Sequence, residues 1–163
     1  GDGKADILWN NTASVYSNVA GYARAGMWLM DGAKAVTTGG ISDQGNSNLL
    51  IIPPKRWIVK GVGDFDGDGK TDIVYQEINS NPRRVAVWFM DGRVRKSKAF
   101  IDSDSEDGTW RIRDIGDYNG DGKADIISQD TYSGDVATWF MNGAAIDSKG
   151  FVEQGVPKTL QIK

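Results

Sequence analysis

Short apolar runs alternate with polar, glycine-rich turns along the whole chain. The run at 85–90, Val-Ala-Val-Trp-Phe-Met, is β-branched and aromatic, and it ends at Asp-Gly, which favours a hairpin turn. Two shorter runs, at 73–75 and 126–127, each lie between an Asp- and Gly-rich segment and a polar one. No window shows apolar spacing of three and four residues over ten or more positions, so the pattern predicts strands and no helix.

The same pattern occurs three times. One shared motif reads GDGKADILW at 1–9, GDGKTDIVY at 67–75 and GDGKADIIS at 120–128. A second reads MWLMDG at 27–32, VWFMDG at 87–92 and TWFMNG at 138–143, and its tryptophans are 60 and 51 residues apart. A third precedes the first motif in two copies, as WIVKGVGD at 57–64 and WRIRDIGD at 110–117. Repeats of about this length are typical of propeller blades or solenoid units.

Each repeat contains four candidate strands, which in the second repeat are 57–62, 71–76, 84–90 and 96–101. Because four short antiparallel strands form a propeller blade, we expect an all-β fold, a β-propeller of four-stranded antiparallel blades, with about three blades in this chain. Residues 42–56, the extra length of the first repeat, are expected to be a loop-like insertion. The expected blades, within one partial propeller domain at 1–163, are 1–52 (first strand missing), 55–104 and 108–153, with 157–163 as a spare blade strand that aligns with 54–60.

The composition excludes several kinds of site. The 163 residues include no Cys, which excludes disulfides and thiolate sites, and no His, the commonest general base and zinc ligand. A net charge of −3, from 19 basic and 22 acidic residues, is too balanced to indicate nucleic-acid binding, and no apolar run approaches the roughly 20 residues of a membrane span. Of the acidic residues 19 are Asp and three are Glu, which favours strands and tight loops over helices.

Two repeats carry an acidic loop with the spacing of a metal site. Carboxylates or an amide occupy positions 1, 3, 5 and 9, a glycine stands at position 6, and a lysine at position 7 could supply a backbone carbonyl. Oxygen ligands in this alternation favour calcium over zinc or copper, and the alternative is a turn-rich hairpin without metal. The expected ligands are Asp64, Asp66, Asp68, Lys70 and Asp72 in the second repeat, and Asp117, Asn119, Asp121, Lys123 and Asp125 in the third.

The first repeat retains only two of these positions. Asp2 stands at position 5 and Asp6 at position 9, and the residues for positions 1 and 3 are absent from this sequence. We therefore expect a first site that is either incomplete or completed by residues from elsewhere.

The segments GDFDGDGKTDI at 63–73 and GDYNGDGKADI at 116–126, with the WxMDG motif, resemble the FG-GAP or VCBS-type repeat. This family occurs in integrin α-subunit propellers, in fungal lectins of the seven-bladed type and in many secreted bacterial proteins. The resemblance implies a calcium-stabilised β-propeller, exported from the cell and used for recognition, with the loop residues above as calcium ligands. The integrin-type Phe-Gly and Gly-Ala-Pro flanks are absent, so integrin-like partner binding is not implied. Dockerins share a similar loop, but a helix follows it there, whereas 73–75 is strand-like here.

Three classes of function are compatible with these features. A carbohydrate-binding, lectin-like module is favoured, because six Trp offer faces that stack on sugar rings and the family's fungal lectins hold sugars between blades. The second class is a structural or adhesive array that binds neighbouring blades of a longer protein or a second copy of the chain. A polysaccharide-active enzyme is the weakest, because the clustered Asp are already assigned to calcium and the three Glu are isolated in sequence.

Most tryptophans are expected in the interior. Trp28, Trp88 and Trp139 recur at one position of the repeat, as a packing layer between blades would, and Trp57 and Trp110 are expected to be packed as well. This leaves one tryptophan as a candidate for ligand contact.

Trp9 is that candidate, because its counterparts in the other repeats are Tyr75 and Ser128, and a position that varies between repeats is freer to serve a ligand. The basic stretches 83–84 and 93–98 are compatible with a surface for an anionic polysaccharide or nucleic acid, but they are expected instead to form a solvated edge strand, where Lys and Arg discourage pairing between sheets.

Overall fold

In the computed structural model, the described residues form β-strands, turns and irregular segments, and none of them is helical. None of these residues belongs to a helix long and apolar enough to cross a membrane. The described residues are 6–11, 23–44, 46–49, 51–52, 57–77, 83–102, 108–157 and 159–160.

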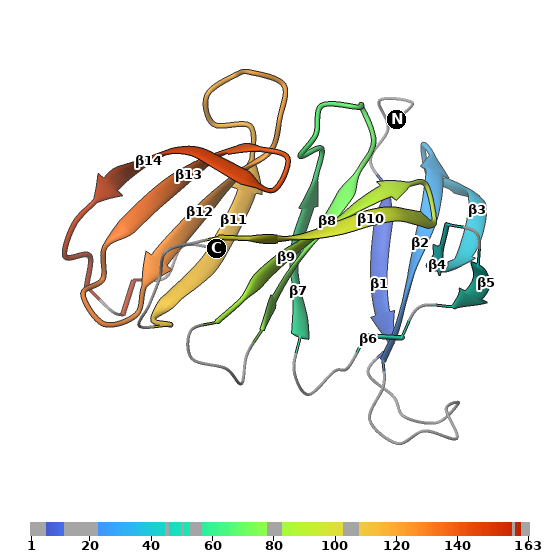
Figure 1. Ribbon diagram of the computed structural model, residues 1–163, viewed down its shortest axis with the longest axis horizontal. Helices are drawn as coiled ribbons and strands as arrows, with labels where there is room; N and C mark the ends of the chain where they lie inside the picture. The colour runs from blue at the N-terminus through green and yellow to red at the C-terminus, as the bar shows by residue number, and fades with distance from the viewer. Residues whose placement is uncertain are drawn as a thin grey trace.

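Three β-sheets stand side by side in chain order, one for each repeat (Figure 1). The second and third follow the order of a blade, β10-β9-β8-β7 and β11-β12-β13-β14, with every neighbouring pair antiparallel. The first contains β1, β2 and β3, with the short β6 paired to one end of β2. The strands are β1 (Ile7–Asn11), β2 (Ala23–Asp31), β3 (Lys34–Gly40), β4 (Ser42–Asp43), β5 (Asn46–Leu49), β6 (Ile51–Ile52), β7 (Trp57–Gly63), β8 (Asp72–Glu77), β9 (Val85–Asp91), β10 (Val94–Ile101), β11 (Trp110–Gly116), β12 (Asp125–Asp130), β13 (Val136–Asn142) and β14 (Ala145–Glu153).

The predicted all-β propeller fold is confirmed, and so are the four strands predicted for the second repeat. Each observed strand, β7 to β10, begins and ends within two residues of its predicted bounds. The agreement arises because tight turns bound these strands: Gly92 and Gly143, at the β9–β10 and β13–β14 hairpins, have φ of 56° and 64°.

The insertion at 42–56 is not simply a loop, and this expectation is wrong. Its first part forms β4 and β5, and β4 pairs in parallel with β10 of the next blade. The Arg95 guanidinium donates two hydrogen bonds to the Asp43 carboxylate, at 2.7 and 2.8 Å, and lies 4.5 Å from the centre of the Trp88 ring. Residues 93–98 are therefore only partly a solvated edge, because the beginning of β10 is covered by β4.

The core lies between the sheets. Side chains that alternate along one strand face opposite neighbours, so that Ile73 packs toward the first sheet and Val74 toward the third, and both are fully buried. The interface of the first and second sheets contains Ala25, Met27, Ile41, Ile73, Tyr75 and Met90, and that of the second and third contains Phe65, Val74, Val85, Val87, Ile101, Ile112, Ala124, Ile126, Trp139 and Met141.

Strands β7 and β11 approach closely where β7 carries glycine. A methyl group at Gly61 would lie 2.8 Å from Cδ1 of Ile115, and one at Gly63 would lie 2.5 Å from Cβ of Ala124. The Ile115 methyl group is the end of a flexible side chain and can rotate away, whereas the Cβ of Ala124 is fixed to the backbone. Glycine is therefore required at position 63 for the second and third blades to approach this closely.

The repeated tryptophans do not form one uniform packing layer. Trp139 is 4 % exposed at an interface between blades, and Trp88 packs against Tyr75 with ring centres 4.6 Å apart. Trp28, in contrast, is 43 % exposed, so the expectation that it is packed is wrong. The difference follows from position in the array, because no described residue covers the face of the first sheet that carries Trp28.

Candidate metal centre

The acidic loop of the second repeat joins β7 to β8, and that of the third joins β11 to β12. Two glycines in each loop adopt left-handed backbone conformations, with φ of 75° and 77° at Gly67 and Gly69 and of 79° and 85° at Gly120 and Gly122. Because L-residues with a side chain rarely adopt such angles, these glycines allow the chain to curl around its own carboxylates.

Asp64 organises the backbone of the first of these loops. Its carboxylate accepts hydrogen bonds from the amides of Gly67 at 2.8 Å, Asp68 at 3.2 Å and Gly69 at 2.7 Å. The loop is therefore wound around the side chain at position 1. Each carboxylate oxygen has two lone pairs, so these bonds leave capacity for a cation.

Asp72 fastens the end of the loop to the sheet. It is 1 % exposed, and its two oxygens accept hydrogen bonds from the amides of Phe65 at 3.0 Å and Met90 at 2.9 Å. Burial raises the pKa of its carboxyl group to about 6, and the negative charges of Asp66 and Asp64 add to the rise. Repulsion among these carboxylates is what a bound cation would relieve.

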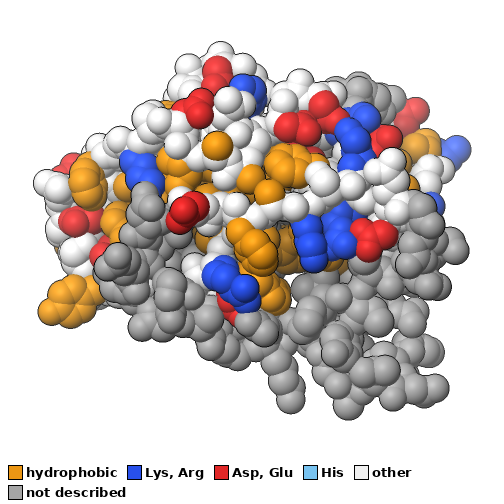
Figure 2. Space-filling model, viewed as in Figure 1, with side chains coloured by type: hydrophobic (Ala, Val, Ile, Leu, Met, Phe, Trp, Pro, Cys, Tyr) orange, Lys and Arg blue, Asp and Glu red, His pale blue; other side chains and the backbone are white. Residues whose placement is uncertain are grey.

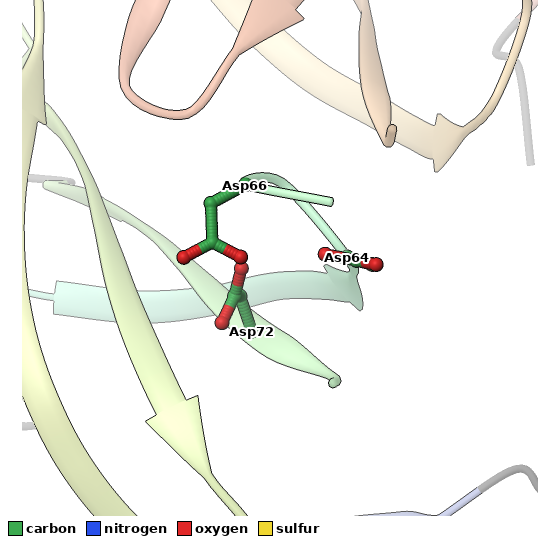
Figure 3. Close-up of side chains that lie close together, drawn as sticks. All are labelled: Asp64, Asp66 and Asp72. Carbon is green, nitrogen blue, oxygen red and sulfur yellow. The ribbon is translucent and has the colours of Figure 1, made fainter. Parts of the chain in front are cut away.

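Three carboxylates gather at one side of the loop. Asp64, Asp66 and Asp72 each offer an oxygen, and these oxygens lie within 4.8 Å of one another. Figure 3 shows the Asp66 and Asp72 side chains directed toward each other, with Asp64 on the adjacent arm of the loop. A set made only of carboxylate oxygens suits a hard divalent cation, so the residues present fit calcium.

Asp68, the predicted position-5 ligand, lies outside this group of three. Its carboxylate accepts hydrogen bonds from the Lys70 amide at 2.9 Å and from the Lys96 ammonium at 3.3 Å. The Lys70 ammonium lies 3.7 Å from the same carboxylate and 3.2 Å from that of Asp91. In this conformation lysines occupy the position-5 carboxylate, and the sequence spacing gave no indication of this.

The loop of the third repeat reproduces the same bonds. Asp117 accepts hydrogen bonds from the amides at 120, 121 and 122, at 2.7, 3.2 and 3.0 Å, and Asp125 accepts from Tyr118 at 3.0 Å and Met141 at 2.9 Å. Asp121 accepts from the Lys123 amide at 2.8 Å. The Asn119 side chain takes the place of the carboxylate of Asp66, so this loop carries one negative charge fewer. Two segments 53 residues apart thus fold into one geometry, which supports a shared role.

The first repeat retains one of these interactions. Asp6 accepts a hydrogen bond from the Met30 amide at 3.0 Å, which is the same contact that Asp72 and Asp125 make in their repeats. Asp2 lies outside the described residues.

Trp9 is partly buried, and its ring lies against the backbone of Gly26, where an added methyl group would overlap it. Its indole nitrogen is buried without a hydrogen-bond partner. The residue lies on the same face of the first sheet as Trp28, two positions from Ile7 along β1.

One surface feature combines a basic residue noted in the sequence with aromatic and acidic neighbours that the sequence did not indicate, and we call it the Arg84 surface: Arg84, Trp57, Phe100 and Glu77. The Arg84 guanidinium lies 5.6 Å from the Trp57 ring centre and 5.2 Å from that of Phe100, and the two rings are 6.1 Å apart. Its Nε donates to the buried Glu77 carboxylate at 2.8 Å. Glu77 and Arg84 have opposite charges and lie close together in sequence, so this ion pair could have been predicted. Trp57 and Phe100 lie on β7 and β10, which β8 and β9 separate within the sheet, so the sequence does not indicate that the two rings meet.

Hydrophobic and basic side chains lie next to one another over β9 and β10 in the middle of the face drawn in Figure 2. Phe100 is 57 % exposed, and the Arg84 side chain is 46 % exposed. An exposed aromatic ring beside a charged hydrogen-bond donor is an arrangement that can contact a polar ligand with a flat apolar side.

A family profile described as FG-GAP-like repeat matches residues 64–128, from the first residue of one acidic loop to the strand that follows the other. The expected FG-GAP-like repeat is confirmed for this segment. No curated protein and no solved structure matches the chain at a significant level.

Proposed function

We propose that this chain is a calcium-stabilised recognition module that works outside the cell and performs no chemistry on its ligand. The observation that carries the proposal is the convergence of the Asp64, Asp66 and Asp72 oxygens within 4.8 Å at the end of the β7–β8 hairpin. FG-GAP repeats are typical of extracellular or surface proteins and are generally non-enzymatic, and the FG-GAP-like match at 64–128 supports both parts of the proposal.

Calcium would act here on stability. The cation would be held by the carboxylates of each acidic loop, and it would offset the repulsion that these groups exert on one another. Extracellular modules bind calcium with dissociation constants of about 10⁻⁴–10⁻³ M. At about 1 mM free calcium, each such site adds roughly 0.4–1.4 kcal/mol to the free energy of unfolding.

The test is thermal unfolding with 1 mM calcium and with EDTA, together with calorimetric titration of calcium. Two sites of this strength raise the melting temperature by several degrees. Asp66→Asn gives the second-repeat loop the amide found at Asn119, so it keeps the loop's hydrogen bonding and weakens calcium binding there. Asp147→Asn removes the same charge from the exposed part of β14 and serves as the control. An unchanged melting temperature in EDTA would show that the loops are not calcium sites.

Glycans are the ligand class that we propose for the recognition role. The Arg84 surface supports this, because Phe100 offers an aromatic face and Arg84 offers donors to sugar hydroxyls. A glycan array probed with and without calcium tests the assignment. Phe100→Ala should abolish binding, whereas Phe151→Ala, at the equivalent position of the third repeat and 62 % exposed, should leave it intact. Absence of binding to any sugar would favour the structural or adhesive role.

A further inference from the structure

Four basic side chains gather where the first strands of the second and third blades meet, and we call them the basic cluster: Lys60 on β7, Arg83 just before β9, and Arg111 and Arg113 on β11. The charges of the three arginines all act on the Lys60 ammonium, and the charge of Arg83 also acts on Arg111. Each of the four side chains is partly exposed. The cluster lies within two blades that both have all four of their strands.

Two members of the cluster occupy the same irregular position of their strands. The pairing of β7 with β8 skips Lys60, and the pairing of β11 with β12 skips Arg113, so each is the extra residue of a β-bulge. A bulge changes the direction of the side chain that it carries, and bulges are common next to functional sites. The two blades therefore present a cation from equivalent places on their first strands.

Hydrogen bonds to uncharged oxygens orient the two guanidinium groups on β11. The Nη1 atom of Arg111 donates to the carbonyls of Gly108 and Trp110, at 2.7 and 3.0 Å. The Nε atom of Arg113 donates to the side-chain oxygen of Gln129 at 3.1 Å. These bonds hold the guanidinium groups in place without neutralising their charge.

Several charged donors of the cluster have no acceptor among the described residues. These donors are Nε and Nη2 of Arg111, both Nη atoms of Arg113, and the charged groups of Lys60 and Arg83. None of the four side chains forms an ion pair with a described carboxylate. Charged donors of this kind make the strongest hydrogen bonds to oxyanions, so the cluster suits an anionic group.

The described acids nearest in sequence to the two β11 arginines make other bonds. Asp114, which follows Arg113 in the chain, accepts hydrogen bonds from a backbone amide and a tyrosine hydroxyl, at 2.9 and 2.7 Å. Asp130 raises the pKa of Arg111 by its charge, but its Oδ1 atom accepts hydrogen bonds from two backbone amides of the turn after β12, at 2.6 and 3.4 Å. Neither carboxylate pairs with the cluster.

The repulsion within the cluster acts most clearly on Lys60. Burial lowers the pKa of its ammonium group, and the charges of the three arginines lower it further. Burial also lowers the pKa of Arg111, and the charges of Arg83 and Arg113 add to the effect. An anion bound among these groups would offset both the repulsion and the loss of hydration.

The basic cluster adjoins the Arg84 surface. Arg83 and Arg84 are consecutive residues, so their Cα atoms are about 3.8 Å apart. Arg84 lies over the Trp57 and Phe100 rings of its own blade, whereas the charge of Arg83 acts on Lys60. The two neighbouring sites together suit a ligand that carries both an apolar ring face and a negative group.

We propose that the basic cluster binds a carboxylate or sulfate group of an acidic glycan, one of whose sugar rings lies against Phe100. The inference rests on the proposed glycan recognition and narrows it to sugars that carry negative charge. A guanidinium group matches two oxygens of such an anion with parallel hydrogen bonds. A nucleic acid fits less well, because the chain has a net charge of −3 and these cations form one compact group instead of a stripe.

The first test is a glycan array in 1 mM calcium that contains hyaluronan, polygalacturonate and chondroitin sulfate oligosaccharides beside neutral dextran and galactan. We expect binding to acidic members only. Calorimetry then compares the tightest acidic sugar with its uncharged form, which is the methyl ester of a uronic acid or the desulfated form of a sulfated sugar. The uncharged form should bind at least tenfold more weakly, because the rings are the same and the anion is lost. The form that loses affinity identifies which anion the cluster holds.

The second test removes charge from the cluster. Lys60→Gln and Arg83→Gln each remove one positive charge without removing a hydrogen bond to a described residue, so both variants should fold. Each should raise the dissociation constant for the acidic sugar about tenfold and weaken its dependence on salt. Lys34→Gln removes the same charge from an exposed position of β3 and should leave the affinity unchanged. Thermal unfolding confirms that each variant is folded.

The results separate this inference from the function on which it rests. Binding confined to neutral sugars, or an affinity for acidic sugars that is unchanged in both Lys60→Gln and Arg83→Gln, would overturn the inference and leave glycan recognition in place. Absence of binding to every sugar would overturn both. Tighter binding to a single-stranded DNA decamer than to any acidic sugar would assign the cluster to a nucleic acid and refute the glycan.

Discussion

The Asp72 carboxylate accepts a hydrogen bond from the amide of Met90, 18 residues further along the chain, at 2.9 Å. Its other oxygen accepts from Phe65, so one buried side chain ties the acidic loop to β9. Asp125 makes the same pair of bonds, to Met141 and Tyr118. The position-9 aspartate therefore links the acidic loop to the next strand of its blade by hydrogen bonds, and it is also a candidate metal ligand.

Asp125→Asn should destabilise the metal-free protein by about 2 kcal/mol. An asparagine side chain has one acceptor oxygen, so one of the two amides, that of Tyr118 or Met141, loses its partner. Urea unfolding in EDTA measures this cost without a contribution from bound metal. Asp121→Asn is the control, because its exposed side chain keeps an oxygen for the Lys123 amide. If both substitutions lowered the free energy of unfolding by the same amount, the two hydrogen bonds of Asp125 would not stabilise the blade as argued.

Titration of Asp72 should make the free energy of unfolding of the metal-free protein depend on pH. Burial raises its pKa to about 6 from an ordinary value of 3.8, so the folded state holds the proton more tightly than the unfolded state. The contribution is fully present below about pH 4 and is lost as the pH rises through about 6. We expect the wild-type protein to lose stability relative to Asp72→Asn between pH 4 and 7 in EDTA. A constant difference between the two across that range would argue against a raised pKa.

Two glycine substitutions should destabilise for different reasons. Gly69→Ala meets no atom within 4 Å but forces a side chain into φ 77°, at a cost of about 1–2 kcal/mol. Gly63→Ala places its methyl group 2.5 Å from Cβ of Ala124, and overpacking of this kind costs about 1–3 kcal/mol. A second change, Ala124→Gly, should rescue Gly63→Ala and leave Gly69→Ala unrescued. Denaturant unfolding of the two double variants measures this, and rescue of both would contradict the assignment.

Arg95→Lys should loosen β4 from β10. Lysine cannot make the two parallel bonds to Asp43, and it stacks less well on the Trp88 ring. The amides of Ser42 and Gln44, which donate to carbonyls of the β9–β10 hairpin and β10, should exchange hydrogen about tenfold faster. Lys98→Arg, a change at an exposed position of the same strand, is the control. Unchanged exchange at both amides would show that the ion pair does not hold β4 in place.

The sequence by itself determined the local structure of this protein. The strands of the second repeat and the two acidic loops follow from alternating apolar residues and from glycines whose φ angles are set locally, so their bounds differ little from prediction. The family resemblance likewise depended on a contiguous motif, and it is confirmed where that motif lies, at 64–128.

Only the tertiary structure decided which equivalent residues are buried and which carboxylates meet. Trp28 and Trp139 hold the same place in their repeats, yet one is exposed and the other is covered, because burial depends on the sheet opposite and not on the strand's own pattern. Asp68 has ligand spacing, but Lys96, 28 residues away, occupies its oxygen. The parallel pairing of β4 with β10 likewise joins segments about 50 residues apart, and the periodicity of one strand says nothing about such a partner.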